Sequence, residues 1–128
     1  MKIAIFGSRK IDIQKVYECL SDWLTPEHEY LTSGNIEGAA KMANIVAQEK
    51  GLTITIYYYS SDGYYQAIRD IMIKNERIVA SCNFAYVFWN GESKGTAREM
   101  KMLEKEGKKY KLTMCNKTIL SKSLIENV

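Results

Sequence analysis

The chain has 128 residues, of which 46% are hydrophobic and 26% are charged, values typical of a single soluble globular domain. No apolar stretch reaches the roughly 18–20 residues of a membrane span, and the N-terminal apolar run is too short for a signal peptide. With three scattered cysteines and one histidine, we expect a cytoplasmic protein with reduced thiols, no bound metal, no cofactor and no membrane partner.

The net charge of +3 is mild, and it is concentrated near the C-terminus, where residues 100–128 hold seven lysines and three glutamates. A basic segment of this kind binds nucleic acid in some proteins. These lysines are not interleaved with aromatic residues in a binding pattern. We therefore interpret them as a solvated surface and do not expect nucleic acid as a partner.

In the first half of the chain, short apolar runs alternate with segments of helical period. The runs at residues 3–6, 29–32 and 52–59 are rich in β-branched and aromatic residues and predict strands. Apolar residues at helical spacing predict a helix over 11–24, ended by Pro26, and small residues predict another over 37–50, ended by Gly51.

The second half continues the same alternation. A loop at 60–63 precedes a long predicted helix over 64–80, and a buried strand follows over 84–89. A helix over 96–106 and a fifth strand over 110–114 complete a predicted domain of residues 1–115. Residues 116–128 form a C-terminal tail with apolar residues spaced for a short helix.

Strands that alternate with helices throughout predict an α/β fold, a Rossmann-like three-layer sandwich with a mainly parallel five-stranded sheet and helices on both faces. In such sheets, ligands bind beyond the carboxyl ends of the strands, at the point where the strand order reverses. The glycine-containing turns that follow the strands should therefore gather at one edge and form one pocket.

Two of these turns follow the first two predicted strands. Gly7 permits a tight turn, Ser8 can cap the next helix or donate to a phosphate oxygen, and Arg9 carries a permanent charge suited to phosphate. Ser33-Gly34-Asn35 is either an ordinary helix start or a second ligand contact. We interpret Glu37, which follows, as a first-turn residue that complements the helix dipole.

The third turn follows the strand at 84–89 and contains Gly91, Ser93, Gly95 and Thr96. A glycine-rich turn that opens a helix presents free backbone N–H groups and the positive end of the helix dipole, which is an anion site. Thr96 suits either a helix cap or a phosphate donor. Trp89, just before this turn, is either a core residue or a surface on which a base stacks.

Two further candidates lie on the predicted helices. Asn75 stands in an apolar stripe, so its amide either ties backbone segments together or contacts a ligand. We expect its neighbours Lys74 and Arg77 to be solvated, with Lys74 also able to reach a phosphate. Glu99 lies in the first turn of its helix and is either a capping residue or a catalytic carboxylate.

Taken in order, these motifs resemble the SLOG superfamily (the SMF/DprA–LOG group), and most closely its small stand-alone YspA-related branch. The branch shows GSR after the first strand, SGGARGAD after the second, RNxxM on the third helix, and W-x-G-x-S-x-GT after a later strand. This chain has GSR at 7–9, SGNIEGA at 33–39, KNERI at 74–78 and WNGESKGT at 89–96. The resemblance covers about residues 1–113.

The resemblance implies a pocket for a nucleotide or nucleotide-derived ligand, with Lys74 and Asn75 matching part of RNxxM, and it implies a homodimer or higher homo-oligomer. The chain departs from the pattern at Asn35, Glu37 and Ala40, where the branch has glycine, arginine and aspartate. Glu99 matches the glutamate of GTxxE in the phosphoribohydrolases of the superfamily, whose PGG is absent here.

Three functions follow as hypotheses. The leading one is binding of a phosphate-bearing nucleotide derivative, by a sensor or a sequestering protein, with the phosphates between the turns at 7–9 and 91–96. The alternative is an N-glycoside hydrolase that acts on a nucleoside 5′-monophosphate through Glu99. The third is a DNA-binding module that uses the lysine-rich end.

Overall fold

The computed structural model describes residues 1–34, 37–57 and 64–115. Several predictions therefore fall outside the described residues: the ligand contact at Asn35, the strand end at 58–59, the loop at 60–63 and the tail at 116–128.

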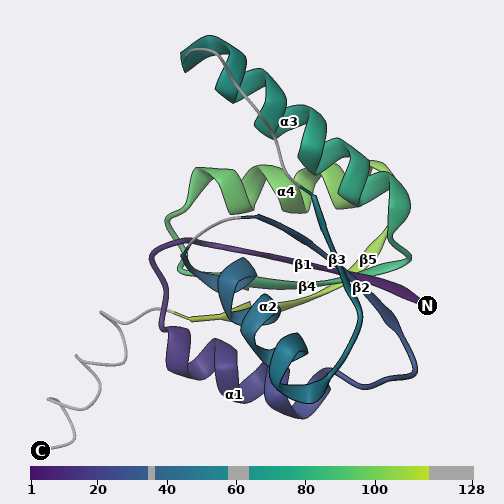
Figure 1. Cartoon of the computed structure of the whole chain (residues 1–128). Coiled ribbons are helices and arrows are strands. Elements are labelled where there is room, and N and C mark those ends of the chain that lie inside the picture. The colour runs from purple at the N-terminus through teal and green to yellow at the C-terminus, as the bar shows by residue number, and fades with distance from the viewer. Residues whose placement is uncertain (35–36, 58–63, 116–128) are drawn as a thin grey trace, which may run out of the picture.

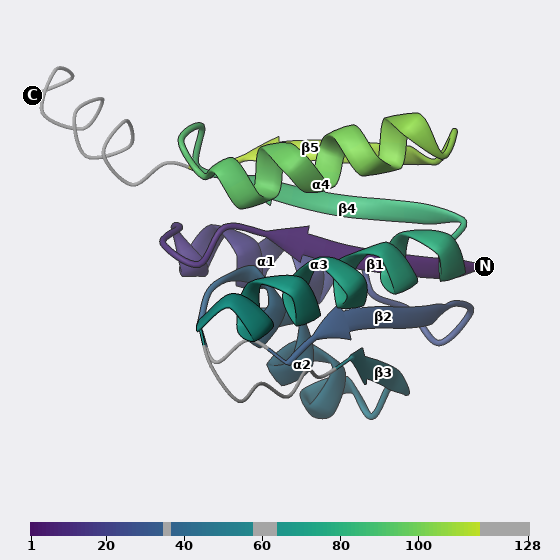
Figure 2. The ribbon, with the colours of Figure 1, turned by 90° about the horizontal axis from the view of Figure 1, so that it is seen from above.

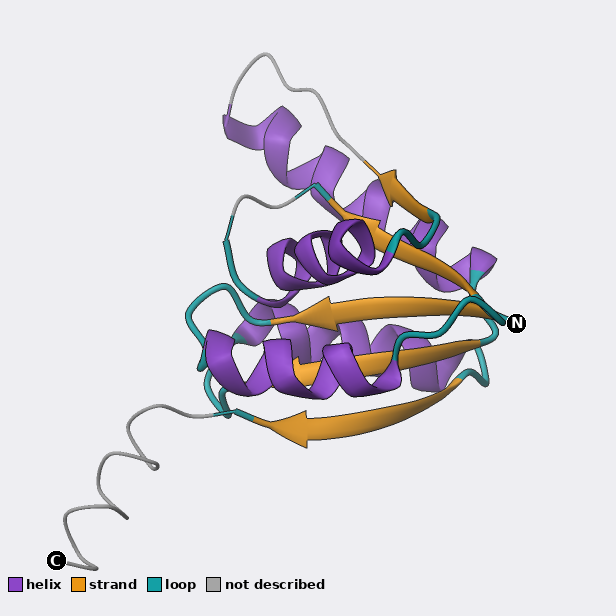
Figure 3. Ribbon diagram, turned by 60° about the horizontal axis from the view of Figure 1, so that its bottom comes forward, coloured by secondary structure: helices purple, strands orange, loops and turns teal. Residues whose placement is uncertain are grey.

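All five predicted strands are present, and every neighbouring pair runs parallel. They form one sheet in the order β3-β2-β1-β4-β5, and their arrowheads in Figure 3 point to the same edge. The strands are β1 (Lys2–Gly7), β2 (Glu29–Ser33), β3 (Ile54–Tyr57), β4 (Phe84–Trp89) and β5 (Lys109–Met114). The parallel five-stranded sheet predicted from the sequence is thus confirmed.

Four helices connect the strands and cover both faces of the sheet, as Figures 1 and 2 show. They are α1 (Ile13–Trp23), α2 (Ala39–Lys50), α3 (Tyr64–Ser81) and α4 (Lys94–Lys105). α1 and α2 lie on one face, and α3 and α4 lie on the other. The molecule is therefore the three-layer sandwich that the sequence predicts.

The central strand β1 shows why the sheet is apolar on both sides. Ile3 and Ile5 point into the core under α1 and α2, whereas Ala4 and Phe6 point into the core under α3 and α4. All four are almost fully buried. A parallel strand covered by helices on both faces needs a continuous apolar run rather than an alternating one, and residues 3–6 supply it.

The helix ends follow local chemistry that is visible in the sequence. Asp12 caps α1 by accepting a hydrogen bond from the backbone N–H of Lys15 at 3.3 Å, so Ser8 does not cap this helix. Gly51 ends α2 with φ +67°, in the left-handed region that glycine adopts without strain. No helix in the described part of the chain has the length and hydrophobicity needed to cross a bilayer.

Candidate functional site

A pocket lies at the edge of the sheet where the carboxyl ends of the strands gather. The chain winds outward from β1 through β2 to β3 and then returns to the other side of β1 as β4, so the strand order reverses between β1 and β4. The pocket has a volume of about 450 Å³. Its described lining residues come from the turns after β1 and β4 and from the segment before α2: Ser8, Arg9, Lys10, Glu37, Asn90, Glu92 and Ser93.

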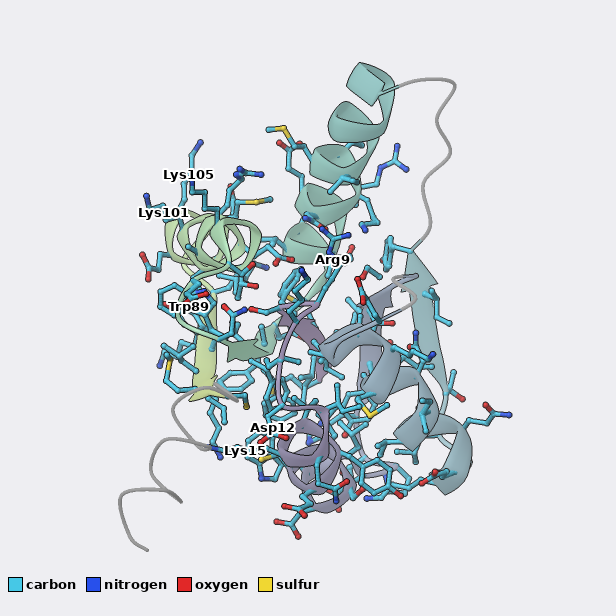
Figure 4. All side chains as sticks on the ribbon, turned by 90° about the vertical axis from the view of Figure 1, so that its left-hand side faces the viewer. Arg9, Asp12, Lys15, Trp89, Lys101 and Lys105 are labelled. Carbon is cyan, nitrogen blue, oxygen red and sulfur yellow. The ribbon has the colours of Figure 1, made fainter. Side chains whose placement is uncertain are left out.

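We call this cavity the switch-point pocket. Its position is the one at which open α/β sheets bind ligands, and its volume falls within the range of small-molecule sites. Arg9 lies near the middle of the view in Figure 4, below α3 and between α4 and α2. The predicted gathering of the first and third turns at one edge is therefore what the structure shows.

Four polar residues join the turn after β1 to the turn after β4, and we call them the turn cluster: Ser8, Asn90, Ser93 and Thr96. The Thr96 hydroxyl donates to Ser93 Oγ at 3.2 Å, so the 3.2 Å contact between the Ser8 and Thr96 hydroxyls uses the proton of Ser8. The backbone N–H of Asn90 donates to Ser8 Oγ at 3.3 Å. Residues more than 80 positions apart in the chain are thus bonded directly.

Asn90 is the centre of this cluster. Its Oδ1 accepts hydrogen bonds from the backbone N–H groups of Glu92 at 2.9 Å and Ser93 at 2.8 Å. Its Nδ2 donates to the backbone carbonyl of Lys10 at 2.8 Å, across to the other turn. One amide side chain therefore shapes the turn after β4 and holds it against the turn after β1.

These bonds bear on which groups are open to a ligand. The Ser8 and Thr96 hydroxyls are each 1% exposed, and they donate to other members of the turn cluster. The backbone N–H of Thr96 donates to Ser93 Oγ, which is the N-cap bond of α4. By contrast, the backbone N–H groups of Arg9 and Lys10 donate to no other residue in the described part of the chain. The backbone N–H groups of Arg9 and Lys10 are thus open to a ligand.

Two glycines allow the segments around the pocket to approach closely. A Cβ on Gly7 would lie 2.3 Å from the Cβ of Ala39, so glycine there lets the end of β1 touch α2. Gly38 has φ +82°, and a Cβ there would lie 2.5 Å from both the Ser8 carbonyl oxygen and Arg9 Cα. The reason for Gly7 is therefore close packing rather than the turn conformation that we predicted.

The other glycines of the third turn differ from each other. Gly91 has φ +84°, which requires glycine on conformational grounds. A Cβ on Gly95 would meet nothing closer than Ser93 Oγ at 3.8 Å, so the structure gives no packing reason for glycine there. Neither residue lines the switch-point pocket.

Three predicted ligand contacts near the sheet edge, Ser33, Gly34 and Trp89, make bonds or contacts within the fold. Ser33 is buried at the end of β2, and the N–H of Gly34 donates to the carbonyl of Tyr57 at 3.1 Å. Trp89 packs against the core under α3 and α4, and its Nε1 donates to the Ser93 carbonyl at 3.0 Å. Ser33, Gly34 and Trp89 do not line the switch-point pocket. The indole of Trp89 therefore supports the turn after β4 from the core side.

α3 carries Lys74 and α4 carries Glu99, and the two side chains interact electrostatically. Lys74 is only 6% exposed, so the expectation that it is solvated was wrong, whereas Arg77 is exposed as predicted. Asn75, the expected buried residue, is half-buried instead. Burial raises the pKa of Glu99 from its usual 4.5 to about 8, although the charges of Lys74 and Arg98 act in the opposite direction.

Lys74 and Glu99 each affect the pKa of the other. Burial lowers the pKa of Lys74, and the negative charge of Glu99 counteracts that effect. A carboxyl group with a pKa near 8 exchanges its proton at physiological pH, a property that acid–base catalysis requires. Neither side chain lines the switch-point pocket.

Among the lining residues that the structure describes, sequence reasoning missed four: Lys10, Glu37, Asn90 and Glu92. α2 begins at Ala39, so Glu37 precedes the helix and lines the pocket. Asn90 directly follows a strand, which is an ordinary place for a turn residue. The available signal was its position: at the end of β4 it meets the turn after β1.

Among the described residues, no group of three or more His, Cys, Asp or Glu residues could hold a metal ion. Comparison with known protein families, curated proteins and solved structures finds no match for this chain. The resemblance to the SLOG superfamily, the homo-oligomer and the cytoplasmic location therefore stay predictions.

Proposed function

We propose that this protein binds a phosphate-bearing nucleotide derivative in the switch-point pocket, as a sensor or a sequestering protein. The observation that carries the proposal is the place of Arg9 and Lys10: both side chains line a pocket at the point where the strand order reverses. Guanidinium and ammonium groups are strong partners of phosphate oxygens.

The backbone around the pocket supports an anion as well. α2 has no side-chain cap at its N-terminus, and its N-cap residue Gly38 lies against Ser8 and Arg9. Glu37, which immediately precedes this helix start, lines the pocket. The first N–H of this helix, that of Ala39, donates to the Ser8 carbonyl at 3.3 Å. The helix end still contributes a partial positive charge. The side chains and the backbone thus favour the same class of ligand.

The test is to denature the purified protein, identify any released small molecule by mass spectrometry, and add nucleotides back in a calorimetric titration. We expect Arg9→Ala to weaken binding by about 1.5–3 kcal/mol, the range for a lost charged hydrogen bond. Arg77→Ala is the matched control, because Arg77 is exposed on α3 and does not line the pocket. Equal affinity in the wild type and Arg9→Ala would refute this placement.

A second function, hydrolysis of the N-glycosidic bond of a nucleoside 5′-monophosphate, draws on Glu99. Its raised pKa suits a group that donates or accepts a proton near neutral pH. This function predicts release of free base, measured by chromatography and abolished by Glu99→Gln but not by Glu104→Gln. Because Glu99 does not line the switch-point pocket, we favour binding without turnover.

A further inference from the structure

Two carboxylates line the switch-point pocket together with the two cations. Glu37 lies just before α2, and Glu92 lies in the turn after β4. In the described part of the chain, neither carboxylate accepts a hydrogen bond or forms an ion pair. The side chains of Arg9 and Lys10 likewise donate no hydrogen bond and form no ion pair there. The two pairs of charges therefore do not neutralise each other by direct contact, and all four face whatever enters the pocket.

The backbone around both carboxylates is anchored to the turn after β1. The N–H of Glu92 donates to Asn90 Oδ1, and Asn90 in turn bonds the Lys10 carbonyl. Glu37 precedes Gly38, which is held against Ser8 and Arg9 by a contact that leaves no room for a Cβ. The backbone that carries the two carboxylates is thus held close to the backbone that carries the two cations.

A pocket with both kinds of charge in its lining treats one phosphate differently from several. A single phosphate can bind beside Arg9 and Lys10, whereas each further phosphate placed in the same pocket adds repulsion from Glu37 and Glu92. Like charges brought together across a binding site disfavour the wrong partner. A carboxylate also accepts hydrogen bonds readily from sugar hydroxyls and ring amino groups.

The structure assigns Glu37 and Glu92 as specificity-determining residues that restrict the switch-point pocket to ligands with a single phosphate and hydrogen-bond donors such as sugar hydroxyls. This assignment rests on the proposed function, because it presupposes that a phosphate binds beside Arg9. It goes further in naming which phosphate compounds the protein rejects, and by which side chains.

Two ligand series test the assignment by calorimetric titration at low salt with EDTA present. The first is AMP, ADP and ATP. The second is phosphate, pyrophosphate and tripolyphosphate, which removes any dependence on the base. An ordinary cationic site binds more tightly as the charge of the anion grows. Here we expect the opposite order, with AMP bound at least about tenfold more tightly than ATP.

The variants Glu37→Gln and Glu92→Gln keep the shape of each side chain and remove its charge. Each should reduce the preference for AMP over ATP by at least about threefold, and the double variant should abolish it. Glu18→Gln is the matched control, since Glu18 is exposed on α1 and its carboxylate accepts only from Gln14 at 3.1 Å. Thermal unfolding of each variant shows that the fold is retained.

The outcomes separate this assignment from the proposal beneath it. Phosphate compounds that bind with ATP favoured in the wild type, or a preference for AMP that both glutamine variants retain, would overturn the charge selection and leave phosphate binding standing. Failure of every compound in both series to bind, phosphate included, would overturn the binding function and the selection together.

Discussion

The turn cluster and the Lys74–Glu99 pair are built in opposite ways. The turn cluster consists of neutral side chains that bond one another and the neighbouring backbone. The pair consists of two ionisable groups, and burial favours the neutral form of each: it lowers the pKa of Lys74 and raises the pKa of Glu99. The first arrangement contains no side chain that ionises near neutral pH, whereas the second contains a carboxyl group whose pKa is raised to about 8 by burial.

The largest effect should come from the glycine that supports the turn cluster from α2. Gly38→Ala forces a Cβ to within 2.5 Å of the Ser8 carbonyl oxygen at a backbone conformation that only glycine adopts easily. We expect a loss of about 3–5 kcal/mol in the free energy of unfolding, measured by urea denaturation. Gly95→Ala, whose Cβ meets nothing within 3.8 Å, should change stability by less than about 1 kcal/mol. Equal effects would contradict the close approach at Gly38.

The next largest effect is a pH dependence of the free energy of unfolding, which we expect from the Lys74–Glu99 pair and not from the turn cluster. Glu99 has a folded pKa of about 8 against its usual 4.5, so between these values the folded protein holds a proton that the unfolded chain releases. Stability is therefore fully present below pH 4.5 and is lost as the pH rises to about 8. We expect the wild type to lose roughly 2–4 kcal/mol over this range relative to Glu99→Gln.

Urea denaturation at a series of pH values between 4.5 and 8.5 measures this difference. Glu29→Gln, at an exposed position of β2, should follow the wild-type curve. A curve for Glu99→Gln that is parallel to that of the wild type would show that Glu99 is ionised in the folded protein.

The smallest effect tests the turn cluster itself. Asn90→Ala removes the acceptor of two backbone N–H groups and the donor to the Lys10 carbonyl, and we expect a loss of about 1.5–3 kcal/mol. This loss should be the same at pH 5 and pH 8, because the groups involved do not ionise. Asn83→Ala, which removes a single exposed bond to the N–H of Lys2, is the milder control. A pH-dependent loss would mean that Asn90 acts through the charged pair.

Much of the architecture could be predicted because it depends on local patterns. The apolar run at 84–89 became β4 with the same bounds, since a strand covered on both faces needs such a run. Gly51 marked the end of α2 because a left-handed cap favours glycine. The joining of the first and third turns followed from the placement of turns in parallel sheets.

The details of the site could not be predicted because they depend on contacts between distant segments. Lys74 and Asn75 stand side by side on α3, and the one that is covered depends on how α4 packs. Asn90 has the properties of an ordinary turn residue until its 2.8 Å bond to Lys10, 80 positions earlier, is known. Glu37 is a helix residue by pattern, and only the start of α2 at Ala39 shows that it lines the pocket.

Ser8 has one further consequence, which concerns how motion spreads from the pocket. Its N–H donates to the Phe88 carbonyl, its carbonyl accepts from the N–H of Ala39, and its hydroxyl accepts from the N–H of Asn90. One residue thus joins β4, α2 and the turn that leads to α4. A displacement of the loop after β1 strains all three bonds at once, so the amides of Ala39 and Asn90 should open to solvent exchange together as a single cooperative unit.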